Sequence, residues 1–444
     1  MGRISHSLCL LALFFLFAGC SKDGNFVVDR MDGETHSGDV PSRNGRVPND
    51  VKNVMLLYSA GFNSLSPFLS EDISDLSQGT LPGNGPDDHI LLVFSQLPTY
   101  YGNYSTKVSP VLFRMYRGDD GFPVRDTVKV WPVDTRASDA RTVHDVLDFV
   151  YKSYPADGYG MVFSSHGTGW LPSGYYTNPS YFDSSFDDGS SFSWVSRRSA
   201  PKNYPREYPE IEPFPVVKSV GQDEGSPSVE IELADFAAAI PYKLDYLLFD
   251  ACLMGTVEVA WELRGKASIV GFSQTEVLAE GFNYHTITTH LLTEFPDPVA
   301  VCRDYFELYD ARSGSERSAT ISVVDTDKMD ALAEVCRTLF AKYRTQMDEV
   351  SSTKVQRYYR YSRQWFYDLR DILKQSGASH EDLELLDGAL SQCVIYKAAT
   401  PNFLSIPIKT ACGLSMYLPK DGSEYLDNFY RSNISWNDAT ALVQ

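Results

Sequence analysis

After its first 20 residues the sequence lacks any apolar run long enough to cross a membrane, which excludes an internal transmembrane helix. It is also short of basic residues, because 39 Lys and Arg face 58 Asp and Glu, giving a formal net charge of −19. Such an acidic surface repels phosphate backbones, so nucleic acid is excluded as a partner. Apolar and aromatic residues are not scarce, at 43% and 13%, and they are sufficient for a large core.

Cysteine is scarce, and its spacing argues against two kinds of site. The chain has 7 cysteines with no CxxC pair, and Cys9 and Cys20 lie near the N-terminus. The others are odd in number: Cys252, Cys302, Cys336, Cys393 and Cys412. Neither a zinc site nor a disulfide framework is indicated, and we predict no metal ligands. An odd thiol in an exported protein is instead a candidate reactive residue.

The N-terminus resembles a bacterial lipoprotein signal. Arg3 precedes an apolar run over 8–17, which is too short to span a bilayer and is followed by Ala18, Gly19 and Cys20. This pattern predicts a signal peptide over 1–19 and an exported protein that is lipid-anchored through Cys20 to a bacterial membrane, in the first place the outer membrane, with surface or periplasmic orientation left open. An ordinary secretory signal with an incidental cysteine is the alternative. Residues 20–50 are rich in Gly, Asp, Ser, Asn and Pro and are predicted to form a flexible tether.

The segment that follows alternates between buried strands and amphipathic helices. Near-continuous apolar runs at 51–58, 89–94, 158–165 and 244–250 are typical of strands covered on both faces. Helical spacing of apolar residues appears at 142–154 and 233–240, and a further helix is predicted over 252–263. This alternation predicts an α/β/α sandwich with a mostly parallel sheet over 51–327.

Two regions depart from this alternation. Residues 171–228 show little periodicity and are predicted to be a long insertion between the third and fourth strands. Residues 328–444 are predicted to be a helical C-terminal region, with helices over 328–344 and 355–373 and another that starts at Ser379. Within this region, 412–418 is predicted to be a late strand that returns to the core.

The third and fourth predicted strands each deliver a reactive side chain at the carboxyl end. The third is followed by His166 and Gly167, and the fourth by Cys252. Sites form at this edge of an open parallel sheet, so we expect the imidazole and the thiol to lie close together. A free thiol is only a few per cent ionised at neutral pH, and an imidazole can take its proton and later protonate a leaving amine. The predicted helix that starts at Cys252 favours the thiolate, and the N–H groups of Gly167 and Cys252 are candidates for an oxyanion hole.

These segments resemble the caspase-like cysteine peptidases, and the clostripain family in particular. Residues 250–255 and 258–263 are similar to that family's nucleophile segment, and 154–157 leading into 166–170 is similar to its histidine segment. Further similar segments are 58–65, where 62–64 is Phe-Asn-Ser and the family tends to have Asp-Asn-Asn, 320–325 and 413–419. The resemblance implies a caspase-like fold and a thiol endopeptidase that cuts peptides and proteins after Arg or Lys, with Cys252 as nucleophile and His166 as acid/base.

Asp250 supports the basic preference that the resemblance implies. Side chains alternate along a strand, so Asp250 and Cys252 face the same side if the strand extends that far, and a carboxylate there can pair with a basic side chain. The alternative is that Asp250 caps the helix predicted to follow it. The family also tends to show a Ser-x-x-Thr-Glu-Pro-Gly segment after this helix. The corresponding residues 273–281 lack the Pro-Gly turn and offer Glu276 and Glu280 for substrate binding.

Several features allow more than one interpretation. No cofactor is required by this chemistry, and a solvated loop is favoured over a Ca²⁺ site, which some relatives use, for the acids Asp183, Asp187, Asp188, Asp223 and Glu224. An enzyme specific for basic residues would be able to cut itself at bases in the insertion: Arg197, Arg198, Lys202, Arg206 and Lys218. A catalytically silent surface lipoprotein that binds peptides or glycans is the alternative function, and an acyl transferase with the same Cys–His pair is a third. The oligomeric state is not indicated.

Overall fold

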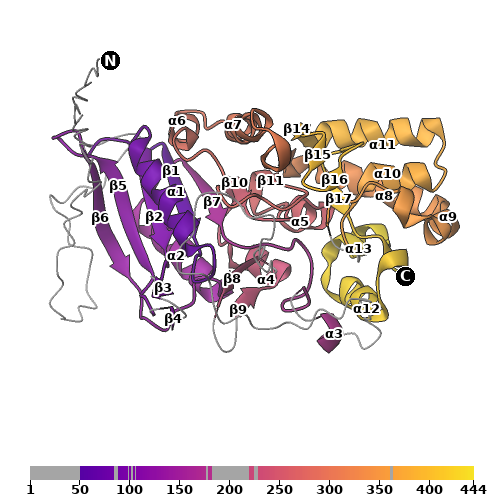
Figure 1. Cartoon of the computed structure of the whole chain (residues 1–444), viewed down its shortest axis with the longest axis horizontal. Coiled ribbons are helices and arrows are strands. Elements are labelled where there is room, and N and C mark those ends of the chain that lie inside the picture. The colour runs from indigo at the N-terminus through magenta and orange to yellow at the C-terminus, as the bar shows by residue number, and fades with distance from the viewer. Residues whose placement is uncertain are drawn as a thin grey trace, which may run out of the picture. The chain divides into compact units, whose positions relative to one another are not determined.

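Five parallel strands form the centre of the main sheet in the computed structural model (Figure 1). Among the described residues, nine strands pair in the order β14-β12-β11-β10-β7-β1-β2-β5-β6. Pairing is parallel from β11 to β2, and the two strands at each edge are antiparallel. The strands are β1 (Asn53–Ser59), β2 (His89–Ser95), β5 (Val111–Arg117), β6 (Pro123–Val130), β7 (Gly158–Ser164), β10 (Leu244–Asp250), β11 (Ala267–Phe272), β12 (Thr320–Asp325) and β14 (Val394–Ala399).

The structure describes residues 51–84, 89–98, 100–101, 104–105, 107–176, 179–182, 220–224, 229–360 and 364–444. The predicted signal peptide, Cys20, the tether and most of the 171–228 insertion lie outside these residues. In the described part of the chain, no helix has the length and apolar composition needed to span a membrane.

Helices cover both faces of the sheet, as a three-layer α/β/α arrangement requires. On one face, a cluster of buried apolar side chains joins the sheet to α1 (Ser66–Gln78), α6 (Ile287–Leu291) and α7 (Pro298–Asp310). On the other face, a larger cluster includes α2 (Ala140–Ser153), α4 (Leu233–Ala239), α5 (Val257–Glu262), α8 (Met329–Lys342), α10 (Leu369–Gln375), α11 (His380–Cys393), α12 (Glu424–Asn433) and α13 (Ser435–Thr440). The last five of these helices gather at the β14 end of the sheet (Figure 1).

Short elements complete the described fold. The two remaining α-helices of the described residues are α3 (Pro179–Phe182) and α9 (Arg344–Glu349). Four two-stranded sheets are formed by β3 (Tyr100–Tyr101) with β4 (Tyr104–Ser105), β8 (Val220–Asp223) with β9 (Val229–Ile231), β13 (Tyr367–Asp368) with β17 (Ser415–Met416), and β15 (Asn402–Phe403) with β16 (Ile406–Pro407).

Apolar periodicity accounts for the elements that were predicted. The four predicted strands are β1, β2, β7 and β10, and they are neighbours in the sheet. Helix α2 buries Val143, Val146, Leu147 and Val150, each worth about 1.5–3 kcal/mol on burial, and Asp139 caps its first turn by accepting from the Arg141 N–H at 2.9 Å. The predictions of a mostly parallel sheet and an α/β/α sandwich are therefore confirmed.

Three local predictions are wrong. The helix predicted from residue 252 begins only at Val257, because Thr256 provides the cap and accepts from the Val259 N–H at 3.1 Å. The helix predicted over 355–373 is reduced to α10, which Asp368 caps. The late strand at 412–418 is only β17, paired with β13, and the C-terminal strand that joins the main sheet is β14.

Candidate active site

The register between β7 and β10 brings His166 and Cys252 to the same edge of the sheet. These strands are parallel neighbours in which Ser164 pairs with Asp250, so His166 and Cys252 each lie two residues beyond this pair. Gly167 packs directly against the cysteine backbone, since a Cβ built on it would lie 2.8 Å from the Cys252 carbonyl oxygen. The two segments thus converge, as parallel strands with reactive residues at equivalent positions must.

A buried polar network holds the end of β7 in place. The Ser165 hydroxyl donates to the Ala60 carbonyl at 2.7 Å, and the Asn63 amide donates to the same carbonyl at 3.0 Å and to that of Gln222 at 2.7 Å. The Gly221 N–H donates to the His166 carbonyl at 3.0 Å. Residues from the turn after β1 and from β8 therefore position the backbone that carries the imidazole.

The imidazole contacts a residue that the sequence did not single out. Ser64 Oγ lies 3.2 Å from His166 Nε2, and it projects from an exposed position just before α1. His166 itself is almost wholly buried, so the exposed Ser64 lies between its ring and the solvent on this side. The sequence showed Ser64 only as a difference from the residue that the family tends to have in this turn. Such a difference does not predict that Ser64 lies near His166.

The segment that carries Cys252 is a tight turn held by backbone hydrogen bonds. Leu253, next to Cys252, has φ of 59°, a left-handed conformation that is uncommon for a residue with a branched side chain. Its N–H donates to the Thr275 carbonyl at 2.9 Å, and the Gly255 N–H donates to the Ser273 carbonyl at 2.7 Å. The segment after β11 therefore fixes the turn in which the thiol sits.

The sulfur atom of Cys252 is buried against that same segment. The Val277 N–H donates to Sγ at 3.2 Å. Burial, with a smaller contribution from the charge of Glu276, raises the pKa of the Cys252 thiol to about 12. The helix that was expected to favour a thiolate begins five residues further on, at Val257, so its N-terminus does not offset the effect of burial.

Two backbone N–H groups beside the thiol make no hydrogen bond within the described part of the protein. They belong to Gly167 and Cys252, the pair predicted for an oxyanion hole. Their positions on adjoining turns leave both donors available for a ligand oxygen.

Asp250 lies at the end of β10 and is buried. Tyr284 donates its hydroxyl to Asp250 Oδ2 at 2.8 Å, and the Phe282 N–H donates to the same oxygen at 3.4 Å. Burial raises the pKa of the Asp250 carboxyl to about 6. The alternative role of a helix cap is wrong, because Thr256 caps α5.

The other two predicted binding acids both pair with arginines of the same chain. Glu276 accepts two hydrogen bonds of 2.7 Å from Arg360, a bidentate and largely buried ion pair. Glu280 pairs with Arg312 in a more exposed position. Sequence reasoning did not predict either arginine, because both lie far from their partners in the sequence.

The remaining predicted sites lie partly outside the described residues. Asp223 is buried and accepts from the N–H and hydroxyl of Ser138, both at 3.1 Å, whereas Asp183, Asp187 and Asp188 are not described. The five insertion bases Arg197, Arg198, Lys202, Arg206 and Lys218 also lie outside the described residues. Within the described residues, no group of three or more His, Cys, Asp or Glu side chains is placed to hold a metal ion.

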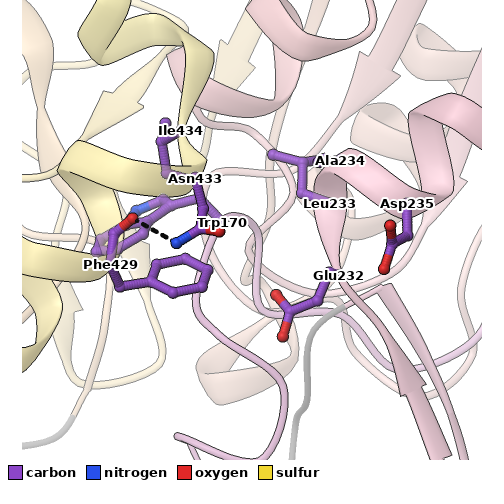
Figure 2. Close-up of a pocket in the computed structure, with 8 residues that line it drawn as sticks. All are labelled: Trp170, Glu232, Leu233, Ala234, Asp235, Phe429, Asn433 and Ile434. Atoms are coloured by element: carbon purple, nitrogen blue, oxygen red, sulfur yellow. Dashed lines mark hydrogen bonds between the residues drawn. The ribbon is translucent and has the colours of Figure 1, made fainter.

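A separate pocket of about 200 Å³ lies between α4 and α12 (Figure 2). Trp170, Glu232 and Asp235 line it together with Phe429 and Asn433. Glu232 is already engaged, since it accepts from the Ser173 N–H at 2.8 Å. Neither Cys252 nor His166 lines this pocket, so it is distinct from the convergence of β7 and β10.

Comparisons with known proteins agree with this geometry. The model of the clostripain family, Peptidase C11, matches residues 57–192 and 207–442. The structure of an inactive zymogen C11 protease from Parabacteroides distasonis is 25% identical, with a TM-score of 0.68 over 89% of this chain and 99% of that one. A secreted C11 cysteine protease from Bacteroides thetaiotaomicron, bound to an irreversible peptide inhibitor, is 23% identical and shares the fold, with a TM-score of 0.68 over 88% of this chain and 99% of that one. No curated protein matches. Because the family model covers most of the sequence, this chain belongs to the clostripain family of cysteine peptidases.

Proposed function

We propose that this peptidase is an endopeptidase that cleaves after Arg or Lys, with Cys252 as nucleophile and His166 as general acid/base. The observation that carries the proposal is the register of β7 and β10. Ser164 pairs with Asp250, and His166 and Cys252 each lie two residues beyond this pair. A binding protein has no need for an imidazole and a thiol at this edge.

The protonation state of the thiol determines the order of events. Because burial keeps Cys252 protonated at rest, His166 takes the Sγ proton as the sulfur attacks the substrate carbonyl. The oxyanion that forms is stabilised by the N–H groups of Gly167 and Cys252. The imidazolium then protonates the leaving amine, the C–N bond breaks and an acyl-enzyme remains. Water, deprotonated by His166, hydrolyses the thioester and restores the thiol.

Asp250 provides the basis for the proposed basic preference. Its carboxyl lies two residues before the nucleophile and is buried, so a guanidinium or ammonium group that reaches it gains a charge-assisted hydrogen bond in a poorly solvated place. Glu276 and Glu280 add negative charge to the same segment, although each also faces an arginine of the chain.

Cleavage of matched peptides tests the function. We expect turnover of peptides with Arg or Lys before the cut under reducing conditions, and little turnover of the same peptides with Leu or Glu there. Cys252→Ala abolishes turnover, whereas Cys393→Ala, which removes another buried thiol on α11, leaves it intact. Cys252-dependent cuts after other residues would keep the peptidase and overturn its specificity.

We also propose that the protein is exported and anchored through a lipid on Cys20. The support is the sequence pattern over 3–20, which combines a basic start, a short apolar run and small residues before the cysteine. Incorporation of labelled palmitate by the wild type but not by Cys20→Ala would support it. Release of both forms into the medium as unmodified protein would overturn it.

A further inference from the structure

Asp72 on α1 is a buried acid without a counter-charge. The residue is 6% exposed and sits among the apolar side chains of α1, next to Ile73 in the cluster that α1 shares with the sheet. Within the described residues, its carboxyl makes no hydrogen bond and no ion pair. A carboxyl in such a place is costly for the fold unless something else satisfies it, so its position calls for a ligand or a shared proton.

The carboxyl of Asp72 interacts electrostatically with the carboxyl of Asp250, at the end of β10. Asp72 and Asp250 both act electrostatically on the phenol of Tyr284, whose hydroxyl donates to Asp250 at 2.8 Å. The loop that carries Tyr284 runs along α1, because the next residue, His285, lies 3.6 Å from Asp75, three residues after Asp72 on the helix. Helix α1, strand β10 and this loop therefore bring the carboxyls of Asp72 and Asp250 and the phenol of Tyr284 near enough to interact electrostatically.

We propose that Asp72 is a second specificity residue of this peptidase, which receives the basic side chain of the substrate together with Asp250. This inference rests on the proposed cleavage after Arg or Lys. Two carboxyls accept the several donors of a guanidinium better than one, so the cluster favours Arg over Lys.

When no substrate is bound, Asp72 and Asp250 together also hold a proton. Burial, and then the charge of Asp250, raise the pKa of Asp72 to about 9, while the pKa of Asp250 is raised to about 6. The groups around the pair are Glu71 and Asp75 on α1, Tyr284 and His285 on the loop, and Tyr305 and Tyr309 on α7. The one cation that acts on these tyrosines is Arg312, which is paired with Glu280, and neither Asp72 nor Asp250 forms an ion pair with a base of the described residues. A bound guanidinium favours the ionised form of both carboxyls, so the proton leaves to solvent and binding strengthens as the pH rises from about 6 to 9.

The test compares Asp72→Asn with Glu71→Gln in the full-length protein. Both variants remove one acid from α1 without changing side-chain size, but Glu71 is exposed. For a peptide with Arg before the cut, Asp72→Asn is expected to raise KM about tenfold or more, and more than for the matched Lys peptide. It also flattens the pH dependence of KM, and the rate at which uncharged iodoacetamide alkylates Cys252 stays unchanged. Equal KM, Arg-to-Lys ratio and pH profile in Asp72→Asn and Glu71→Gln would overturn the inference.

A second measurement needs no change at Asp72. Calorimetry of agmatine binding to Cys252→Ala, at pH 7.5 in two buffers of different ionisation enthalpy, counts the protons released. Release of close to one proton supports the inference, and binding without release overturns it. Failure of the proposed function is seen separately, as an absence of Cys252-dependent cleavage after Arg and Lys by the wild type. Loss of cleavage in Asp250→Asn but not in Asp72→Asn keeps that function and removes only the role of Asp72.

Discussion

In the proposed mechanism His166 transfers a proton, so the atoms that contact its ring should affect the rate. Ser64 Oγ, in the turn after β1, lies 3.2 Å from Nε2 of the His166 ring. Ser64→Ala removes a hydrogen bond worth about 1 kcal/mol, so we expect kcat to fall about fivefold with KM unchanged. Because the serine is exposed, the midpoint of thermal unfolding should not move. Steady-state kinetics and a melting curve check this, and an unchanged kcat would show that the hydroxyl does not orient the imidazole.

Gly167 leaves no room for a side chain. A Cβ there would lie 2.8 Å from the Cys252 carbonyl oxygen and 2.9 Å from Met254 Sδ. We expect Gly167→Ala to displace the nucleophile turn, lowering kcat/KM about a hundredfold and the free energy of unfolding by about 1–3 kcal/mol.

Gly388 on α11 provides the matched control for this substitution. A Cβ there would meet nothing within 4 Å, so Gly388→Ala should keep activity and stabilise the helix by up to about 1 kcal/mol. Kinetics and urea denaturation of both variants check the pair. Full activity of Gly167→Ala would mean that the two turns are not tightly packed in solution.

Among the elements, the segment before α10 is tied to the segment after β11 by one ion pair. Arg360 and Glu276 form it, and both charges act on Cys252 in opposite directions, with Glu276 raising the pKa of the thiol and Arg360 lowering it. We expect Arg360→Gln to slow alkylation of Cys252 by iodoacetamide at a given pH, and Glu276→Gln to accelerate it. Arg360→Gln should also lower the free energy of unfolding by about 3 kcal/mol, since it leaves a buried carboxylate unpaired.

Arg370→Gln serves as the control, because it breaks an arginine–carboxylate pair with Asp387 between α10 and α11. Its alkylation rate should match the wild type. A shift of Arg360→Gln and Glu276→Gln in the same direction would refute the electrostatic explanation.

The elements also show where sequence patterns were sufficient. Strands β1, β2, β7 and β10 are buried on both faces, so their apolar runs are continuous and were easily found. The aromatic segment 355–368 was predicted as helix because its apolar residues also fit a helical spacing. Its conformation is tied to other parts of the chain instead, since the Tyr358 hydroxyl donates to Asp368, ten residues away, at 2.9 Å and to the Thr410 carbonyl at 3.3 Å.

The sequence predicted those residues of the candidate site that lie at the carboxyl ends of the predicted strands. His166 and Cys252 follow two buried strands, Asp250 is the last residue of the second, and all three lie in segments that resemble the family. Ser64 contacts His166 and Arg360 contacts Glu276 from elements that are remote in the sequence, Asp72 interacts with Asp250 in the same way, and nothing local marks these three residues. Tertiary approach, rather than composition or periodicity, decides which of the many acids and hydroxyls of the chain lie there.

For the molecule as a whole, the buried carboxyls make stability depend on pH. An aspartate ionises near pH 4 in the unfolded chain, but the pKa of Asp72 is about 9 in the fold, so the folded state holds a proton that the unfolded state has released. This contribution is complete below about pH 4 and is lost as the pH rises towards 9. We therefore expect Asp72→Asn to be more stable than the wild type at pH 8 and equal to it near pH 4. Urea denaturation across this range checks the difference, and parallel pH curves for both proteins would contradict it.

Burial of the cysteine thiols affects how fast the protein is oxidised. The five cysteines of the described part are all free and buried, and burial raises the pKa of every one of these thiols. Oxidants and disulfides react with thiolates, so none of these sulfur atoms offers them an easy target at neutral pH. The protein is accordingly expected to keep its five thiols reduced during long storage in aerated buffer without added reductant, and thiol titration over time checks this.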